Sequence, residues 1–236
     1  MIKAVLFDIG DVVFNEDIPH SWLFHCCFLA LRKHGKTISW DKYDAERIRL
    51  ASNGPNPEAA IKATVVHFTS GHTEGEIIWH EARAEYERMR AVRPYGFLLD
   101  GITSALQDLG RDFKLGIVAN QHPPVADAIA EYGVAKLFDT IVISETVNLY
   151  KPDPAIFELG LSNLGVIPGE AIFIGDRPDN DVKPAKALGM KTIRFKRGNQ
   201  YVYFNPDTPD MTADVTITDV TQIPSAVRQL AAGSQQ

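Results

Sequence analysis

The chain has no long hydrophobic run. No apolar stretch among its 236 residues approaches the roughly 20 residues that a helix needs to cross a bilayer. The N-terminal segment MIKAVLFDIG reaches an aspartate at once, without the longer apolar region and small-residue cleavage site of a secretory signal peptide. The sequence therefore predicts a cytoplasmic protein with no membrane partner.

Cysteine is scarce as well. The chain contains only two cysteines, Cys26 and Cys27, and they are adjacent. Neighbouring cysteines rarely form a disulfide, because the ring that they would close is strained. We expect two buried thiols on a helix, in a protein of a reducing compartment.

Positive charge is not in excess. The chain has 24 Lys and Arg against 30 Asp and Glu, which gives a formal net charge of −6. This balance argues against nucleic acid as a standing partner, since phosphate backbones are bound by clustered Lys and Arg. A small anionic ligand is still compatible with it, because a local site can be positive or hold a metal.

Short apolar segments alternate with helical patterns from about residue 100 onward. This alternation is typical of βαβ units and predicts an α/β fold with a doubly wound, Rossmann-like parallel sheet. The expected strands cover residues 3–8, 114–120, 139–144, 171–176, 191–195 and 214–218. The expected helices cover residues 100–110, 123–133, 154–165, 180–189 and 224–232.

Residues 15–95 have a different pattern. Apolar positions recur there at helical spacing, and SNGPNPEAA interrupts the pattern near its middle. We therefore predict a core formed by residues 1–14 and 96–236, with an inserted α-helical domain over residues 15–95.

Polar residues stand at the ends of the predicted strands. Asp8, Asn120 and Asp176 each end a strand, Asp181 follows five positions after Asp176, and Lys151 follows the strand over 139–144. Ligands of open α/β sheets bind at the carboxyl ends of the strands, so these groups are expected to converge. Carboxylates suit Mg²⁺, while a lysine and an amide suit phosphate oxygens.

Each of these residues has a simpler interpretation when it is taken alone. An aspartate or asparagine after a strand is commonly a turn or cap residue, and Lys151 before Pro152 could be an ordinary surface lysine. The ordered combination, with each member at or near a strand end, favours a phosphoryl-transfer site.

With these residues identified, the sequence resembles the haloacid dehalogenase (HAD) superfamily, in particular its phosphatases with a helical cap. The resemblance rests on four ordered motifs over nearly the whole chain: FDIGDVV, GIVANQ, YKPDPAIF and GDRPDNDVKPAKALGM. It implies that Asp8 is the nucleophile that forms a phosphoaspartyl intermediate. It also implies that the helical insert is a cap that closes over the substrate.

The same resemblance implies the metal and phosphate ligands. Mg²⁺ would be bound by Asp8, the backbone carbonyl of Gly10 and Asp176, with Asp181 bound directly or through water. Two further residues would contact the phosphate: Lys151, which also pairs with Asp8, and Asn120.

Two positions depart from the family pattern. Gly10 stands where these phosphatases have a second aspartate, which protonates the leaving oxygen and then activates water, and Ala119 replaces a phosphate-binding hydroxyl. Asp11 is expected to point away from the vacant position, because adjacent side chains of an extended segment point to opposite sides. Other candidates for the acid–base role are His122, Glu16, Asp17 and His20.

The sequence thus predicts a Mg²⁺-dependent phosphatase that hydrolyses the phosphomonoester of a small metabolite, slowed by the missing carboxylate at Gly10. Two alternatives stay open at this point. One is a 2-haloacid dehalogenase, which also lacks the second aspartate, and the other is a degenerate phosphate-binding or regulatory module. The helical insert could also pair with a second copy to form a homodimer.

Overall fold

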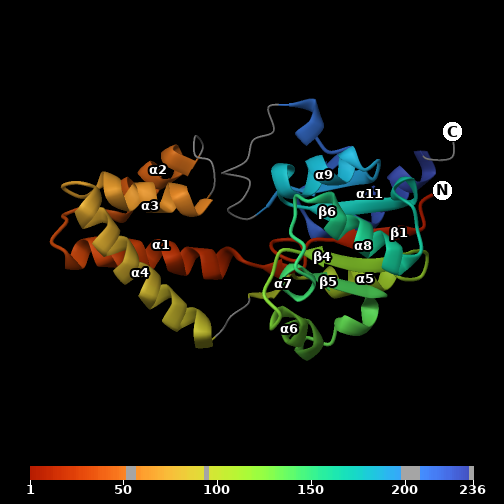
Figure 1. Ribbon diagram of the computed structural model, residues 1–236, viewed down its shortest axis with the longest axis horizontal. Helices are drawn as coiled ribbons and strands as arrows, with labels where there is room; N and C mark the ends of the chain where they lie inside the picture. The colour runs from red at the N-terminus through yellow and green to blue at the C-terminus, as the bar shows by residue number, and fades with distance from the viewer. Residues whose placement is uncertain (52–56, 93–95, 198–207, 234–236) are drawn as a thin grey trace. The chain divides into compact units, whose positions relative to one another are not determined.

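The chain folds into two compact units. The computed structural model describes residues 1–51, 57–92, 96–197 and 208–233 (Figure 1). Of these, residues 1–15, 97–197 and 208–233 form a core unit, and residues 16–96 form a helical unit. Both junctions lie one residue from the predicted ones; the role of the helical unit as a cap stays a prediction.

A six-stranded parallel sheet forms the centre of the core unit. Its strand order is β5-β4-β1-β6-β7-β8, and every described pair is parallel. The strands are β1 (Ala4–Phe7), β4 (Lys114–Ala119), β5 (Thr140–Ile143), β6 (Ala171–Gly175), β7 (Lys191–Phe195) and β8 (Val215–Ile217). The predicted α/β fold with a parallel sheet is therefore confirmed.

Helices cover the sheet because its central strands are apolar on both faces. All four residues of β1 are buried, as expected for a parallel strand between two helical layers. The main helices of the core are α5 (Ile102–Leu109), α6 (Val125–Glu131), α8 (Pro154–Leu164), α9 (Lys183–Ala187) and α11 (Ile223–Gly233). Helix α8 lies close to the sheet, since a side chain at Gly160 would meet Val118 at 2.6 Å.

Short elements differ from the sequence-based expectation. Helix α7 (Ser144–Val147) begins at the last residue of a predicted strand, and a π-helical turn (Pro178–Val182) precedes α9. Strands β2 (Phe14–Asn15) and β3 (Phe97–Leu98) form an antiparallel pair where the chain leaves and re-enters the core. Elements of two to five residues are too short to produce a readable periodicity.

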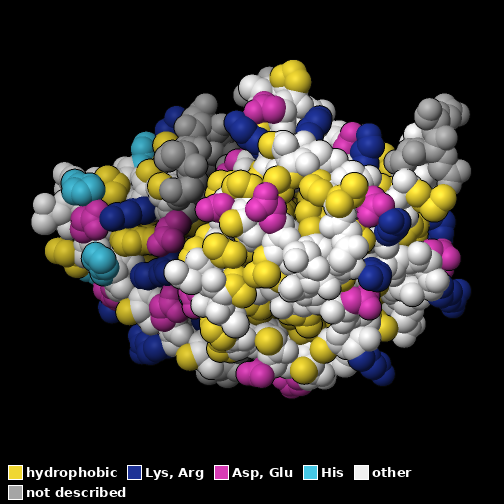
Figure 2. Space-filling view, turned by 45° about the vertical axis from the view of Figure 1, so that its right-hand side comes forward, with side chains coloured by type: hydrophobic (Ala, Val, Ile, Leu, Met, Phe, Trp, Pro, Cys, Tyr) yellow, Lys and Arg dark blue, Asp and Glu magenta, His cyan; other side chains and the backbone are white. Residues whose placement is uncertain are grey.

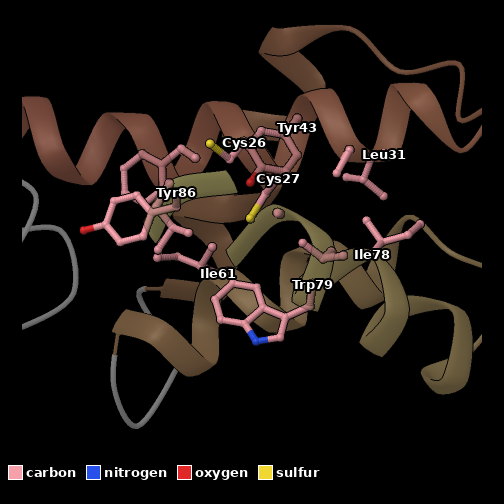
Figure 3. Close-up of a cluster of buried hydrophobic side chains, with 13 residues drawn as sticks. Cys26, Cys27, Leu31, Tyr43, Ile61, Ile78, Trp79 and Tyr86 are labelled. Atoms are coloured by element: carbon pink, nitrogen blue, oxygen red, sulfur yellow. The ribbon is translucent and has the colours of Figure 1, made fainter. Parts of the chain in front are cut away.

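The helical unit has a hydrophobic core of its own. It consists of α1 (Asp17–Lys33), α2 (Trp40–Ala51), α3 (Pro57–His67) and α4 (His72–Val92). Figure 3 shows Cys27 from α1, Tyr43 from α2 and Trp79 from α4 in one buried cluster. The two cysteines are buried and unbridged on α1, so the prediction of buried thiols on a helix is confirmed, and the reducing compartment stays a prediction. Burial raises the pKa of the Cys27 thiol to about 12.

The surface charges and the helices of the described residues agree with the sequence composition. Figure 2 shows acidic and basic side chains interspersed on one face of the core unit. Among the described residues, every helix is too short or too polar to cross a membrane.

Candidate active site

Three neighbouring strands deliver the predicted polar residues to one edge of the sheet. Strands β4, β1 and β6 are adjacent and parallel, and their carboxyl ends lead directly into Asn120, Asp8 and Asp176. The backbone N–H of Asp8 donates to the carbonyl of Ile174 on β6 at 2.9 Å, which extends the sheet to the first of these residues. The structure therefore places these three side chains at the edge where ligands of such sheets bind.

Lys151 links two carboxylates of the site. Its Nζ donates to Oδ1 of Asp8 at 2.6 Å and to Oδ1 of Asp181 at 2.7 Å. The lysine side chain is 2% exposed, and the Asp8 side chain is 13% exposed. Burial alone would lower the pKa of Lys151, but the carboxylates of Asp181 and Asp8 outweigh it and raise the pKa. The lysine is therefore a fixed positive charge beside Asp8.

The loop that carries Lys151 is fixed at both ends. The Asp153 side chain caps helix α8 by accepting a hydrogen bond from the Ala155 N–H at 2.9 Å, with Pro154 in the first turn. On the other side, the Asn120 amide binds the Lys151 backbone twice. Its Nδ2 donates to the Lys151 carbonyl at 2.8 Å, and its Oδ1 accepts from the Lys151 N–H at 2.7 Å. Asn120 thus holds the lysine in place.

Asp8, Asp176 and Asp181 form a carboxylate cluster. One oxygen of each lies within 4.8 Å of the others. Burial, followed by the charges of Asp181, Asp8 and Asp11, raises the pKa of Asp176 well above its usual value. Among the described residues, no hydrogen-bond donor binds the Asp176 carboxylate. A buried cluster of hard oxygen donors in this state fits a divalent cation such as Mg²⁺, which would offset the mutual repulsion.

The turn after β6 brings Asp181 into this cluster. A Cβ atom on Gly175 would lie 2.4 Å from the Cβ of Asp181, so only glycine allows this close approach. The backbone N–H of Arg177 donates to Oδ2 of Asp181 at 3.0 Å, while Oδ1 binds Lys151. Burial raises the pKa of Asp181, and the charge of Lys151 opposes this effect. Since both oxygens of Asp181 already accept hydrogen bonds, the geometry suits a water-mediated contact with a cation.

The Asp11 carboxylate, one residue after Gly10, pairs with an arginine of a distant segment. After Ile9, whose carbonyl accepts hydrogen bonds from Val13 and Phe14 at 2.9 Å each, the chain turns sharply. Asp11 has φ of +53° in this turn, its side chain is 1% exposed, and its carboxylate accepts from Nη1 of Arg197 at 3.2 Å. Asp11 is therefore a buried turn residue that is paired with Arg197.

The other candidate acid–base groups lie in different places. Nδ1 of His122 lies 2.6 Å from Oε1 of Glu145, which follows the edge strand β5. Glu16 belongs to the helical unit, and the side chains of Asp17 and His20 lie outside the described part of the structure. Of these candidates, His122 is the one whose side chain the structure describes in the core unit, and it pairs with Glu145.

Sequence reasoning missed three structural contacts around the site. Asn120 was expected as a phosphate ligand, and its contacts with the Lys151 backbone were not foreseen; its role toward phosphate stays a prediction. The Arg197 partner of Asp11 and the need for glycine at position 175 were also missed. The Gly–Asp pair at 175–176 was a usable signal for the last of these, because glycine before a functional residue often marks close packing.

The comparisons with known proteins agree on a family. Residues 2–189 match the family model described as haloacid dehalogenase-like hydrolase. The chain is 27% identical to a glyceraldehyde 3-phosphate phosphatase of Methanopyrus kandleri, over 98% of this chain and 99% of that protein. It is 30% identical to a protein of the same name from Pyrococcus furiosus, over 94% of this chain and 91% of that one.

A solved structure supports the fold. A HAD-hydrolase of Bacillus subtilis bound to magnesium superimposes with a TM-score of 0.65 at 16% identity, covering 96% of this chain and 98% of that one. From the matched family model, the relatives and the parallel sheet with its carboxylate edge, we conclude that the chain belongs to the haloacid dehalogenase-like hydrolases.

Proposed function

We propose that this hydrolase is a Mg²⁺-dependent phosphatase that acts on a small phosphorylated metabolite through a phosphoaspartyl intermediate on Asp8. The observation that carries the proposal is the Lys151 ammonium held between Asp8 and Asp181 beside a carboxylate cluster. A nucleophilic carboxylate and a phosphate repel each other, so a site that joins them needs positive charge on both sides. The names of the relatives, which are phosphatases, support the same reaction class.

In this mechanism a carboxylate oxygen of Asp8 attacks phosphorus, and the bond to the leaving oxygen breaks. Lys151 orients Asp8 and lowers the repulsion of the incoming phosphate, and the second N–H of the Asn120 amide is suited to a phosphate oxygen. Water then releases phosphate and restores the carboxylate. When bound by Asp8, Asp176, the Gly10 carbonyl and the nearby Asp181, Mg²⁺ would neutralise charge on the phosphoryl oxygens.

The helical unit is proposed to act as the cap of this enzyme. A unit of four helices with its own core, inserted between β2 and β3, is suited to close over a bound ligand and exclude water. In that role the helical unit would set the substrate specificity. The relatives' name suggests glyceraldehyde 3-phosphate as one compound to test.

The decisive experiment measures phosphate release from a panel of phosphorylated metabolites, with and without Mg²⁺. We expect Mg²⁺-dependent turnover that Asp8→Asn abolishes and that Asp127→Asn, an exposed aspartate on α6, leaves intact. Chloride release from 2-chloropropionate instead would establish dehalogenation. Tight phosphate binding without any turnover in the wild-type chain would point to a binding module, and either result would refute the proposal.

A further inference from the structure

The described core offers no proton for a leaving group next to Asp8. Position 10 carries no side chain. Lys151 donates hydrogen bonds to two carboxylates, those of Asp8 and Asp181. Asp176 and Asp181 belong to the carboxylate cluster that suits a cation. When a phosphate ester is cleaved, its leaving oxygen takes an electron pair, and an alkoxide is too basic to depart readily without a proton.

Asp11 does not supply this proton. Its side chain is buried, and its carboxylate accepts a hydrogen bond from Nη1 of Arg197 at 3.2 Å. His122 does not supply it either. Its ring pairs with Glu145 on α7, and its side chain is 59% exposed, so it faces solvent. Among the described core residues, both candidate proton donors are thus paired with other side chains, His122 with Glu145 and Asp11 with Arg197.

We propose that this site selects substrates by their leaving group and that acyl phosphates are its best class. The inference rests on the proposed phosphatase function. In an acyl phosphate the leaving group is a carboxylate, chemically the same as the nucleophile Asp8. The P–O bond to Asp8 forms as the P–O bond to the substrate acyl oxygen breaks, and the electron pair leaves on a carboxylate. One mixed anhydride replaces another, and no proton is transferred.

A second consequence concerns the phosphoenzyme. Its hydrolysis requires water to lose a proton, which must go to phosphate oxygens or solvent because the described core residues place no unpaired base beside Asp8. The reverse step, attack of a free carboxylate on the phosphoaspartate, needs no base. Exchange between a free carboxylate and an acyl phosphate is therefore faster than net hydrolysis.

The test uses the wild-type chain with Mg²⁺ and four substrates: acetyl phosphate, p-nitrophenyl phosphate, phenyl phosphate and glyceraldehyde 3-phosphate. We expect kcat/KM to fall steeply in that order, as the leaving group becomes more basic. We also expect labelled acetate to enter acetyl phosphate faster than phosphate is released. Equal kcat/KM across the series would overturn the inference, because a proton donor would then be supplied, for example by the helical unit.

A variant provides an independent readout. Gly10→Asp introduces a carboxylate two residues from the nucleophile, and general acid–base catalysis is typically worth about 10²–10⁴-fold. We expect turnover of glyceraldehyde 3-phosphate to rise by a factor in this range while phosphorylation by acetyl phosphate changes little. The control is Gly169→Asp, because a side chain at Gly169 meets nothing within 4 Å. An equal gain for both substrates would contradict the inference.

The outcomes separate the two proposals. If no substrate releases phosphate with Mg²⁺, the phosphatase function itself fails. If all are turned over at similar rates, the function stands and the leaving-group inference alone is refuted. If Gly10→Asp does not fold, the wild-type series and the acetate exchange still decide.

Discussion

Replacing Asn120 with alanine should weaken both the fold and the chemistry, because this amide holds the backbone of Lys151. Two hydrogen bonds, of 2.8 and 2.7 Å, join residues 31 positions apart in the sequence. A hydrogen bond contributes about 0.5–1.5 kcal/mol net, so their loss should lower the free energy of unfolding by about 1–3 kcal/mol. The cost arises partly because the Lys151 N–H and carbonyl lose their partners in a partly buried loop.

The effect on catalysis follows from the position of the lysine. If the loop relaxes, Nζ of Lys151 no longer lies at 2.6 Å from Asp8, and a misplacement of about 1 Å can cost roughly 10²-fold in rate. We therefore expect kcat of Asn120→Ala to fall by one to two orders of magnitude. KM should rise as well if the second N–H of the amide contacts the phosphate.

Urea unfolding and steady-state kinetics with Mg²⁺ measure these effects. The matched control is Asn163→Ala on α8, whose Nδ2 makes one exposed hydrogen bond of 3.0 Å to Thr140. The reasoning is refuted if Asn120→Ala is as stable as the control and raises KM with kcat unchanged. That result would assign the amide to the ligand alone.

Three further predictions test the cation site, its supporting glycine and the helical unit. Gly175→Ala should destabilise the core by about 1–3 kcal/mol, as overpacking does, and abolish phosphatase activity by displacing Asp181, as unfolding and kinetic assays will show. Mg²⁺ at 100 times its Kd should stabilise the protein by about 2.7 kcal/mol in thermal unfolding, and Asp176→Asn should remove that gain. Hydrogen bonds from the Lys36 ammonium and the backbone N–H of Ser70 lower the pKa of Glu74 from 4.5 to about 2. Its stabilisation should therefore be present above pH 4.5 and lost as pH falls through 2, so the Tm difference between wild type and Glu74→Gln should vanish at the acid end.

Much of the core could be predicted because its determinants are local. Buried parallel strands read as continuous apolar runs, and their polar C-terminal neighbours meet at one edge whatever the details of packing. Asp8, Asn120 and Asp176 could therefore be expected together from the sequence alone. The position of Lys151 followed less directly, since it stands several residues after β5.

The remaining features depend on contacts between distant segments. Asp11 and Arg197 are 186 positions apart, and nothing in either segment alone indicates that they meet. The Asn120 amide could equally have faced a ligand, because an amide serves a backbone or a phosphate with the same atoms. Only the path of the loop before α8, which the Asp153 cap fixes, decides between these partners.

The order of Gly10 and Asp11 is best understood from the backbone. The turn after Ile9 places residue 11 at φ of +53°, a region where glycine is the default and aspartate is tolerated better than most residues. The chain thus has glycine at position 10, where a carboxylate could transfer a proton. It has aspartate at position 11, where the backbone conformation favours glycine. The ion pair with Arg197 gives that aspartate a structural role, because it joins the turn beside Asp8 to the segment after β7. A carboxylate at position 11 thus supports the turn after Asp8, and it does not replace a proton-transferring carboxylate at position 10.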